Sequence, residues 1–120
     1  LTVLLHKNPT LERLKKSTPI LSVEERKQIL LSLKYVDEVV VYESEDDLLN
    51  ILTNSKIDIR FLGDDYKNKE TFTGSNLDID IFYIDRHHGW SSTKIKNTIH
   101  SQISDEKVYT RELNFNEKLD

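Results

Sequence analysis

The sequence predicts an α/β domain with a doubly wound, mostly parallel sheet. Two observations lead to this class: apolar runs of strand length alternate with amphipathic helical segments, and the first run is apolar without alternation, as in strands that are covered on both faces. Right-handed crossovers in such a fold place helices over the sheet. Ligands of these sheets bind at the carboxyl ends of the strands, so polar segments that follow strands are the first places to look for a site.

Four strands are predicted in chain order. The first run, residues 1–6, should be buried because its apolar residues do not alternate with polar ones. The other three strands are residues 36–42, 57–62 and 79–84.

The helices between the strands are marked by their start signals. Ser22 and Glu25 form a capping box that opens a helix over residues 22–34, with Ile29, Leu30 and Leu33 on one face. Ser44 and Asp47 open a second helix in the same way, which Asn54 and Ser55 end. Asn8 and Pro9 begin a short helical turn, and a last helix carries isoleucines at a spacing of four: Ile95, Ile99 and Ile103.

Composition limits the classes of function. A chain of 120 residues with 37% hydrophobic residues suits one domain, and a formal net charge of −4 argues against a general polyanion binder. The absence of cysteine excludes disulfides and thiolate metal sites. No apolar run approaches the roughly 18 residues of a membrane span, and no signal peptide is visible, so the cytoplasm is the default expectation.

The segment of residues 86–95 joins the fourth strand to the last helix and has the composition of an anion site. The start of a helix leaves backbone N–H groups unpaired and carries a partial positive charge, and Arg86 and Lys94 add full charges nearby. Ser91, Ser92 and Thr93 are equally typical of a simple N-cap. Spacing alone leaves these two interpretations evenly matched.

Three segments together resemble the bacterial cytidylyltransferase family, that is, the glycerol-3-phosphate cytidylyltransferase-like nucleotidyltransferases. They are residues 25–40, the motif Gly63-Asp64-Asp65-Tyr66, and residues 86–95, in which an arginine and a glycine-containing loop precede Ser-Ser-Thr at the start of a helix. The resemblance spans residues 1–103 in the family's order, and it leaves residues 104–120 as a polar tail. It implies a Rossmann-like domain that transfers CMP from CTP to a phosphorylated alcohol such as glycerol 3-phosphate, with release of pyrophosphate.

The resemblance also implies roles for single residues. Arg86, Ser91, Ser92 and Thr93 would bind the triphosphate at the helix start, Lys16 or Lys15 would reach it from a basic loop, and Lys16 and Arg86 would act in catalysis. Asp64 or Asp65 would lie near the cytosine. Lys34 and Asp37 match a segment that lies near the nucleotide or the dimer contact in relatives. Mg²⁺ is expected to bind through the phosphates of CTP, and the resemblance implies a homodimer.

The chain departs from the family pattern at three points. Lys34 stands where arginine is common, and Trp90 stands where an aliphatic residue is more usual. The family's His-x-Gly-His motif is absent, since His6, His87, His88 and His100 do not have that spacing. The motif belongs to the family's first βα unit of ~30 residues, which this chain lacks on our interpretation. In the doubly wound order that strand lies between the second and fourth, so a gap is predicted in the sheet. Residues 1–120 alone should therefore be inactive and poorly stable.

Two alternatives remain open at the level of sequence. The chain could be a catalytically incomplete fragment that binds nucleotide and dimerises, or an adenylyltransferase of the same fold. A metal site at His87 and His88 is disfavoured, because neighbouring residues of an extended chain point in opposite directions and no third ligand is evident. We therefore expect no metal held by protein side chains alone.

Overall fold

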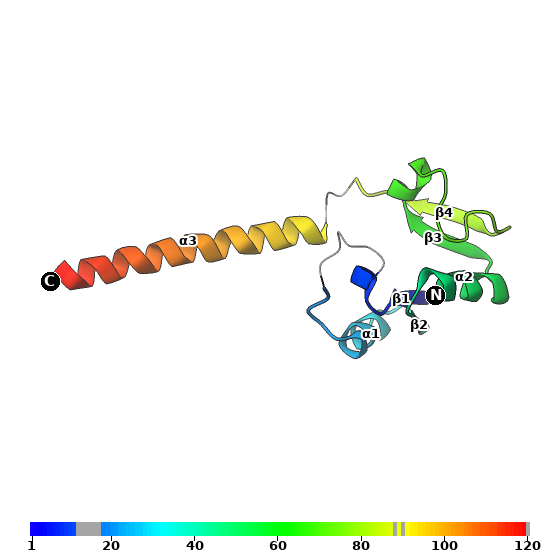
Figure 1. The fold of residues 1–120 in the computed structure, drawn as a ribbon, viewed down its shortest axis with the longest axis horizontal. Helices are drawn as coiled ribbons and strands as arrows, with labels where there is room; N and C mark the ends of the chain where they lie inside the picture. The colour runs from blue at the N-terminus through cyan, green and yellow to red at the C-terminus, as the bar shows by residue number, and fades with distance from the viewer. Residues whose placement is uncertain (12–17, 88, 90, 120) are drawn as a thin grey trace. The chain divides into compact units, whose positions relative to one another are not determined.

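The computed structural model describes residues 1–11, 18–87, 89 and 91–119. They belong to two compact units, Leu1–Tyr83 and Ile84–Asp120, which are described separately. Strands alternate with helices along the chain, as the sequence predicts (Figure 1). The elements are β1 Thr2–His6, η1 Pro9–Leu11, α1 Val23–Leu31, β2 Glu38–Tyr42, α2 Glu45–Asn54, β3 Ile59–Gly63, η2 Asp64–Asn68, β4 Asp80–Ile84 and α3 Ser92–Leu119.

The strands β1 and β2 form a parallel pair. Thr2 is opposite Glu38 at one end of the pair, and His6 is opposite Tyr42 at the other. Parallel neighbours need a crossover connection, which here contains α1. The parallel arrangement and the alternation of strands and helices therefore confirm the predicted α/β class.

The sheet is not continuous in the described part of the chain. One two-stranded sheet contains β1 and β2, and a second contains β3 and β4, whose arrows point the same way in Figure 1. The rings of Phe61 of β3 and Phe82 of β4 lie next to each other in this second pair, with centroids 5.8 Å apart. The division between the two sheets agrees with the gap predicted from the sequence, and the single doubly wound sheet is absent among these residues.

Both predicted capping boxes are present. The Ser22 side chain accepts a hydrogen bond from the Glu25 backbone N–H, and the Glu25 side chain accepts one from the Ser22 N–H. Ser44 and Asp47 bond in the same reciprocal way at the start of α2. The first helix ends at Leu31 instead of Lys34, because Ser32 closes its last turn and its hydroxyl donates to the Ile29 carbonyl.

The hydrophobic core of the described residues is small. Val39 of β2 and Leu48 and Leu52 of α2 are buried, with Leu52 only 3% exposed. The prediction of a buried first strand is wrong, since no residue of β1 is buried and its pattern is exposed to half-buried. The physical reason is that β1 has only one neighbouring strand here. The predicted apolar face of the first helix is likewise uncovered, with Ile29 54% and Leu33 53% exposed.

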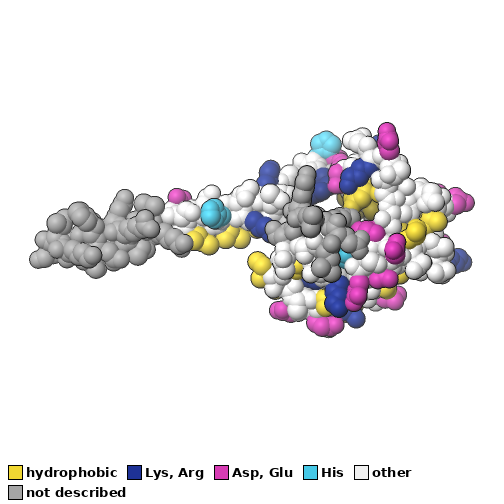
Figure 2. Space-filling model, in the orientation of Figure 1, with side chains coloured by type: hydrophobic (Ala, Val, Ile, Leu, Met, Phe, Trp, Pro, Cys, Tyr) yellow, Lys and Arg dark blue, Asp and Glu magenta, His cyan; other side chains and the backbone are white. Residues whose placement is uncertain are grey.

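The last helix is longer than predicted. Helical backbone continues from Ser92 to Leu119, where the sequence predicts a polar tail after residue 103. No glycine or proline interrupts this span, so no residue in it strongly opposes helix formation. Ile95, Ile99 and Ile103 lie in an exposed row, visible as hydrophobic side chains along the described part of α3 in Figure 2. The division of the chain into residues 1–103 and 104–120 stays a prediction.

No helix among the described residues is both long and apolar enough to cross a membrane.

A tight turn anchors the segment between β3 and β4. Gly74 has a φ of +79°, a left-handed conformation that side chains disfavour. A Cβ atom placed there would lie 2.7 Å from Leu52 Cδ1 of the core and 3.1 Å from Arg60 Nη1. Glycine is therefore required both by the backbone and by the close approach to α2.

Replacing Gly74 by alanine is expected to lower the free energy of unfolding by about 2 kcal/mol or more. The energetic cost of the strained φ and that of the close contact with Leu52 add together. Gly63→Ala is the control, since its φ of −64° is ordinary for alanine and no such loss is expected. Urea unfolding followed by circular dichroism measures both. Equal stability of the two variants would contradict this account of the turn.

The capping box of α1 should make that helix sensitive to acid. Hydrogen bonds from the Ser22 backbone and side chain lower the pKa of Glu25. A carboxyl group whose pKa is lower in the folded state stabilises it above its unfolded pKa, about 4.3, and this contribution is lost as the pH falls through the folded value. The protection factors of the amides of α1, which compare exchange with its intrinsic rate at each pH, should therefore fall more steeply below about pH 4.3 than in Glu25→Gln, which lacks this titration. The same pH dependence in both proteins would refute the prediction.

Candidate functional site

The residues predicted to bind a ligand fall into both compact units. In the first unit they lie in η2, which begins directly after β3. In the second unit they lie in the segment before α3 and in its first turn. Both positions follow the carboxyl end of a strand, which is where the sequence placed them.

The turn η2 presents two neighbouring carboxylates. Asp64 is half-buried and Asp65 is exposed at the first turn of this 3-10 helix. Tyr66 follows them, and its ring meets the Phe72 ring edge-on, with centroids 5.7 Å apart at 87°. Lys69 Nζ lies 4.3 Å from the centroid of the Tyr66 ring. Aromatic packing therefore holds the turn that carries the two aspartates.

The sequence prediction missed Arg60 of β3, a half-buried cation. Its Nη1 atom donates a hydrogen bond of 2.6 Å to the Thr73 carbonyl oxygen, and its guanidinium carbon lies 5.5 Å from the centroid of the Phe72 ring. Burial lowers the pKa of Arg60, which nevertheless stays charged at neutral pH. The sequence signal that could have identified this residue is its place in a strand between the apolar residues Ile59 and Phe61.

In the second unit, Ser91 is the N-cap of α3. Its side-chain oxygen accepts a hydrogen bond of 3.1 Å from the Lys94 backbone N–H, and its carbonyl oxygen accepts from the Ile95 N–H. This confirms the N-cap interpretation for Ser91. It does not exclude an anion, because a hydroxyl that accepts one bond still has a proton to donate. Ser92 and Thr93 follow in the first turn with exposed side chains.

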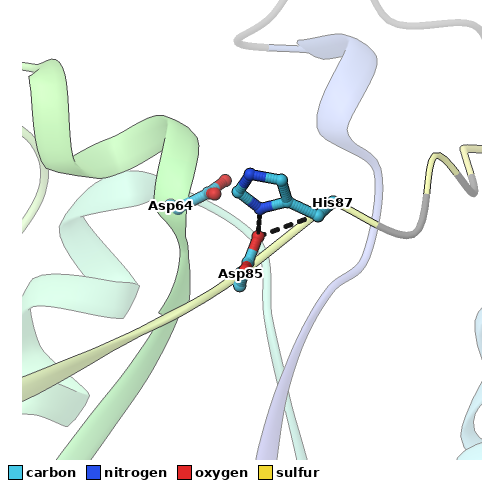
Figure 3. A group of neighbouring side chains, drawn as sticks. All are labelled: Asp64, Asp85 and His87. Carbon is cyan, nitrogen blue, oxygen red and sulfur yellow. Dashed lines mark hydrogen bonds and ion pairs between the residues drawn. The ribbon is translucent and has the colours of Figure 1, made fainter.

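The segment that leads to α3 is folded by local hydrogen bonds. The Gly89 N–H donates to the Arg86 carbonyl oxygen at 3.3 Å, and Gly89 has a φ of +72°. The Asp85 carboxylate accepts a bond of 2.9 Å from the His87 backbone N–H and also contacts the His87 ring (Figure 3). Asp64, which Figure 3 also draws, belongs to the first unit. Asp85 thus orders the backbone directly after Arg86.

The carboxyl end of β1 is held by an arginine of α1. Arg26 donates to the His6 carbonyl oxygen at 2.9 Å and to that of Lys7 at 2.5 Å. The His6 ring stacks on Tyr42 of the neighbouring strand, with centroids 4.7 Å apart. These contacts satisfy backbone groups that would otherwise end the strand unpaired.

The remaining predicted residues are less informative. Lys34 is exposed, with Nζ 5.4 Å from the centroid of the Tyr35 ring. Asp37 is exposed and pairs with the amino group of Leu1 at 2.5 Å. Lys15, Lys16, His88 and Trp90 lie outside the described residues. The structure therefore neither supports nor opposes the roles given to Lys15 and Lys16.

Comparison with known proteins identifies the family. Residues 1–98 match the cytidylyltransferase-like family, and this chain belongs to it. The matched range includes η2 and the segment that leads into the first turn of α3.

Named relatives carry two different descriptions. The chain is 37% identical over 108 residues to the bifunctional protein HldE of Campylobacter concisus (strain 13826), covering 89% of this chain and 22% of that protein. It is 35% identical over 78 residues to the glycerol-3-phosphate cytidylyltransferase of Bacillus subtilis (strain 168), covering 65% of this chain and 59% of that protein. It is 38% identical over 103 residues to the bifunctional protein HldE of Helicobacter pylori (strain J99 / ATCC 700824), covering 82% of this chain and 22% of that protein. The chain thus spans about a fifth of the two HldE proteins and 59% of the cytidylyltransferase.

Replacing Ser91 by alanine should loosen the start of α3. Loss of an N-cap hydroxyl costs about 1 kcal/mol, and the bond to the Lys94 N–H is the one removed. Amide hydrogen exchange at Lys94 is expected to rise several-fold. Ser92→Ala is the matched control, because its exposed side chain is one residue inside the helix. If Lys94 exchanges at the same rate in both variants, Ser91 is not the cap.

Proposed function

We propose that this protein is a nucleotidyltransferase that transfers CMP from CTP to a phosphorylated alcohol such as glycerol 3-phosphate and releases pyrophosphate. The observation that carries the proposal is the family match over residues 1–98, which contains both polar segments in the family's order. Similarity to a protein described as glycerol-3-phosphate cytidylyltransferase supports the choice of substrates.

The chemistry needs no covalent intermediate. An oxygen of the acceptor's phosphate attacks the α-phosphorus of CTP in line, the new P–O bond forms, and the bond from the α-phosphorus to the bridging oxygen breaks. Pyrophosphate leaves with the electron pair of that bond. Catalysis therefore consists mainly of aligning the two phosphates and neutralising the charge that develops on the leaving group.

The residues before α3 suit the β- and γ-phosphates. Arg86 supplies a permanent positive charge and a planar fork of donors, which match phosphate oxygens. Unpaired N–H groups of the first helical turn add to it, and the hydroxyls of Ser91, Ser92 and Thr93 can donate further bonds. Lys16, with Lys15 as the alternative, would add charge from the basic loop and share the catalytic role with Arg86.

Mg²⁺ would enter this site bound to the phosphates of CTP. Residues 86–93 contain an arginine, two histidines, three hydroxyls and no carboxylate, so they suit the phosphate oxygens better than a hard cation. When bound, the ion neutralises charge on the leaving pyrophosphate. The protein's own groups bind and orient the triphosphate around it.

The base would be recognised in the first unit, by Asp64 or Asp65. A carboxylate can accept a hydrogen bond from the exocyclic amino group of cytosine. Adenine also has an exocyclic amino group, so an adenylyltransferase of the same fold is the related alternative. The relative rates with CTP and ATP decide between the two bases.

A second candidate function is nucleotide binding without turnover. It is favoured by the small buried core of three residues among those described. In this case the chain would be a binding and dimerisation fragment, with Lys34 and Asp37 near an isologous contact. Analytical ultracentrifugation measures the proposed dimer directly.

The enzyme proposal predicts release of pyrophosphate when the intact protein is incubated with Mg²⁺, CTP and glycerol 3-phosphate, and slower release with ATP; residues 1–120 alone are expected to be inactive. A coupled pyrophosphate assay measures both. Binding of CTP by calorimetry without any pyrophosphate would favour the second candidate. Absence of both binding and turnover would overturn the proposed function.

Arg86→Met should weaken the binding of inorganic tripolyphosphate by roughly tenfold or more, because hydrogen bonds to a charged group are lost. Arg86→Lys should recover only part of the affinity, since the charge remains and the fork does not. Lys96→Met, which removes a positive charge from an exposed position of α3, is the matched control. Equal affinity of the Arg86 and Lys96 variants would remove Arg86 from the site.

A further inference from the structure

Arg60 is a half-buried cation in the middle of β3. A charge that is partly removed from water needs partners, and the Thr73 carbonyl oxygen is one of them at 2.6 Å. The negative charge of Glu45 in α2 also stabilises its charged form. The guanidinium is therefore a point at which several segments of the first unit meet.

A continuous series of contacts leads from Arg60 to η2. The guanidinium carbon lies 5.5 Å from the centroid of the Phe72 ring, and this ring packs edge-on with that of Tyr66. Tyr66 is the residue directly after Asp64 and Asp65 in η2. The position of Phe72 therefore affects the orientation of the turn that carries both carboxylates.

The turn that carries Phe72 is also bonded to α2. The Thr73 hydroxyl donates a hydrogen bond of 2.7 Å to Glu45 Oε2 in the first turn of α2. The neighbouring Gly74 is buried and lies close to Leu52 of the core. The turn at residues 72–75 is therefore bonded to α2 and packed against its core residue, and Arg60 contacts the Phe72 ring of the same turn.

We propose that Arg60 is a positioning residue on which binding of the nucleobase depends. It acts through Phe72 and Tyr66 on the orientation of Asp64 and Asp65, which would accept the hydrogen bonds of the base. The inference rests on the proposed function, and it assigns to Arg60 no contact with the ligand. Binding of the triphosphate is assigned to the segment before α3 and is independent of Arg60.

Lysine is not an adequate replacement for this role. A guanidinium is planar, so it can lie over a ring while one of its N–H groups donates to a carbonyl oxygen. An ammonium is a compact, strongly hydrated charge, which makes both contacts at once less favourable. The affinity of Arg60→Lys for CTP should therefore lie between those of the wild type and of Arg60→Met.

The test compares CTP with inorganic tripolyphosphate by calorimetry in the presence of Mg²⁺. Arg60→Met is expected to weaken CTP binding roughly tenfold and to change tripolyphosphate binding less than twofold, because only the base-reading turn is displaced. Phe72→Leu should have the same selective effect. Lys56→Met, which removes an exposed positive charge just before β3, is the control and should leave both affinities unchanged.

Nuclear magnetic resonance gives a second measurement that needs no ligand. In Arg60→Met the backbone amide signals of η2 should shift or broaden, while those of α1 stay in place. Equal weakening of CTP and tripolyphosphate, or unchanged η2 signals with unchanged CTP affinity, would overturn the inference alone. A wild-type protein that binds neither ligand would overturn the proposed function, and the inference with it.

Discussion

The packing of α2 against β2 is the interaction on which the rest of the first unit depends. Leu48 and Leu52 of α2 and Val39 of β2 are its buried hydrophobic residues in the described part of the chain. The turn at Gly74 approaches Leu52 from another side, and Thr73 bonds to Glu45 at the start of the same helix. Because so few residues are fully buried, this one helix supports both the β1–β2 pair and the segment that follows β3.

Polar contacts extend this support to the strand ends. Arg26 holds the carbonyl groups at the end of β1, and Arg60 holds the turn that packs on Tyr66 of η2. Both arginines bind backbone oxygens: Arg26 does so where the chain leaves β1, and Arg60 does so in the turn at Thr73, between η2 and β4. In a parallel α/β fold the carboxyl ends of the strands form the edge at which ligands bind, and a small displacement there changes which groups a ligand meets.

Local sequence signals predicted most of the elements. The Ser22–Glu25 and Ser44–Asp47 pairs identified two helix starts, because a capping box depends on residues only three apart. Burial was predicted less well. The apolar pattern of residues 1–6 gives a strand, but whether that strand is covered depends on distant segments, and here β1 has a single neighbour. The sequence underestimates the length of α3, because apolar residues become sparse after residue 103 although no glycine or proline interrupts the helix.

The sequence by itself determined the α/β class, the position of the two polar segments after strands, and membership of the cytidylyltransferase-like family, since these depend on short-range patterns and motifs. It also indicated the break in the sheet, through the motif that it lacks. Only the tertiary structure decided that Ser91 caps α3 and that Arg60 joins β3 to the Thr73 turn. The contact of Arg60 spans 13 residues and depends on how the chain folds back, which no local pattern specifies.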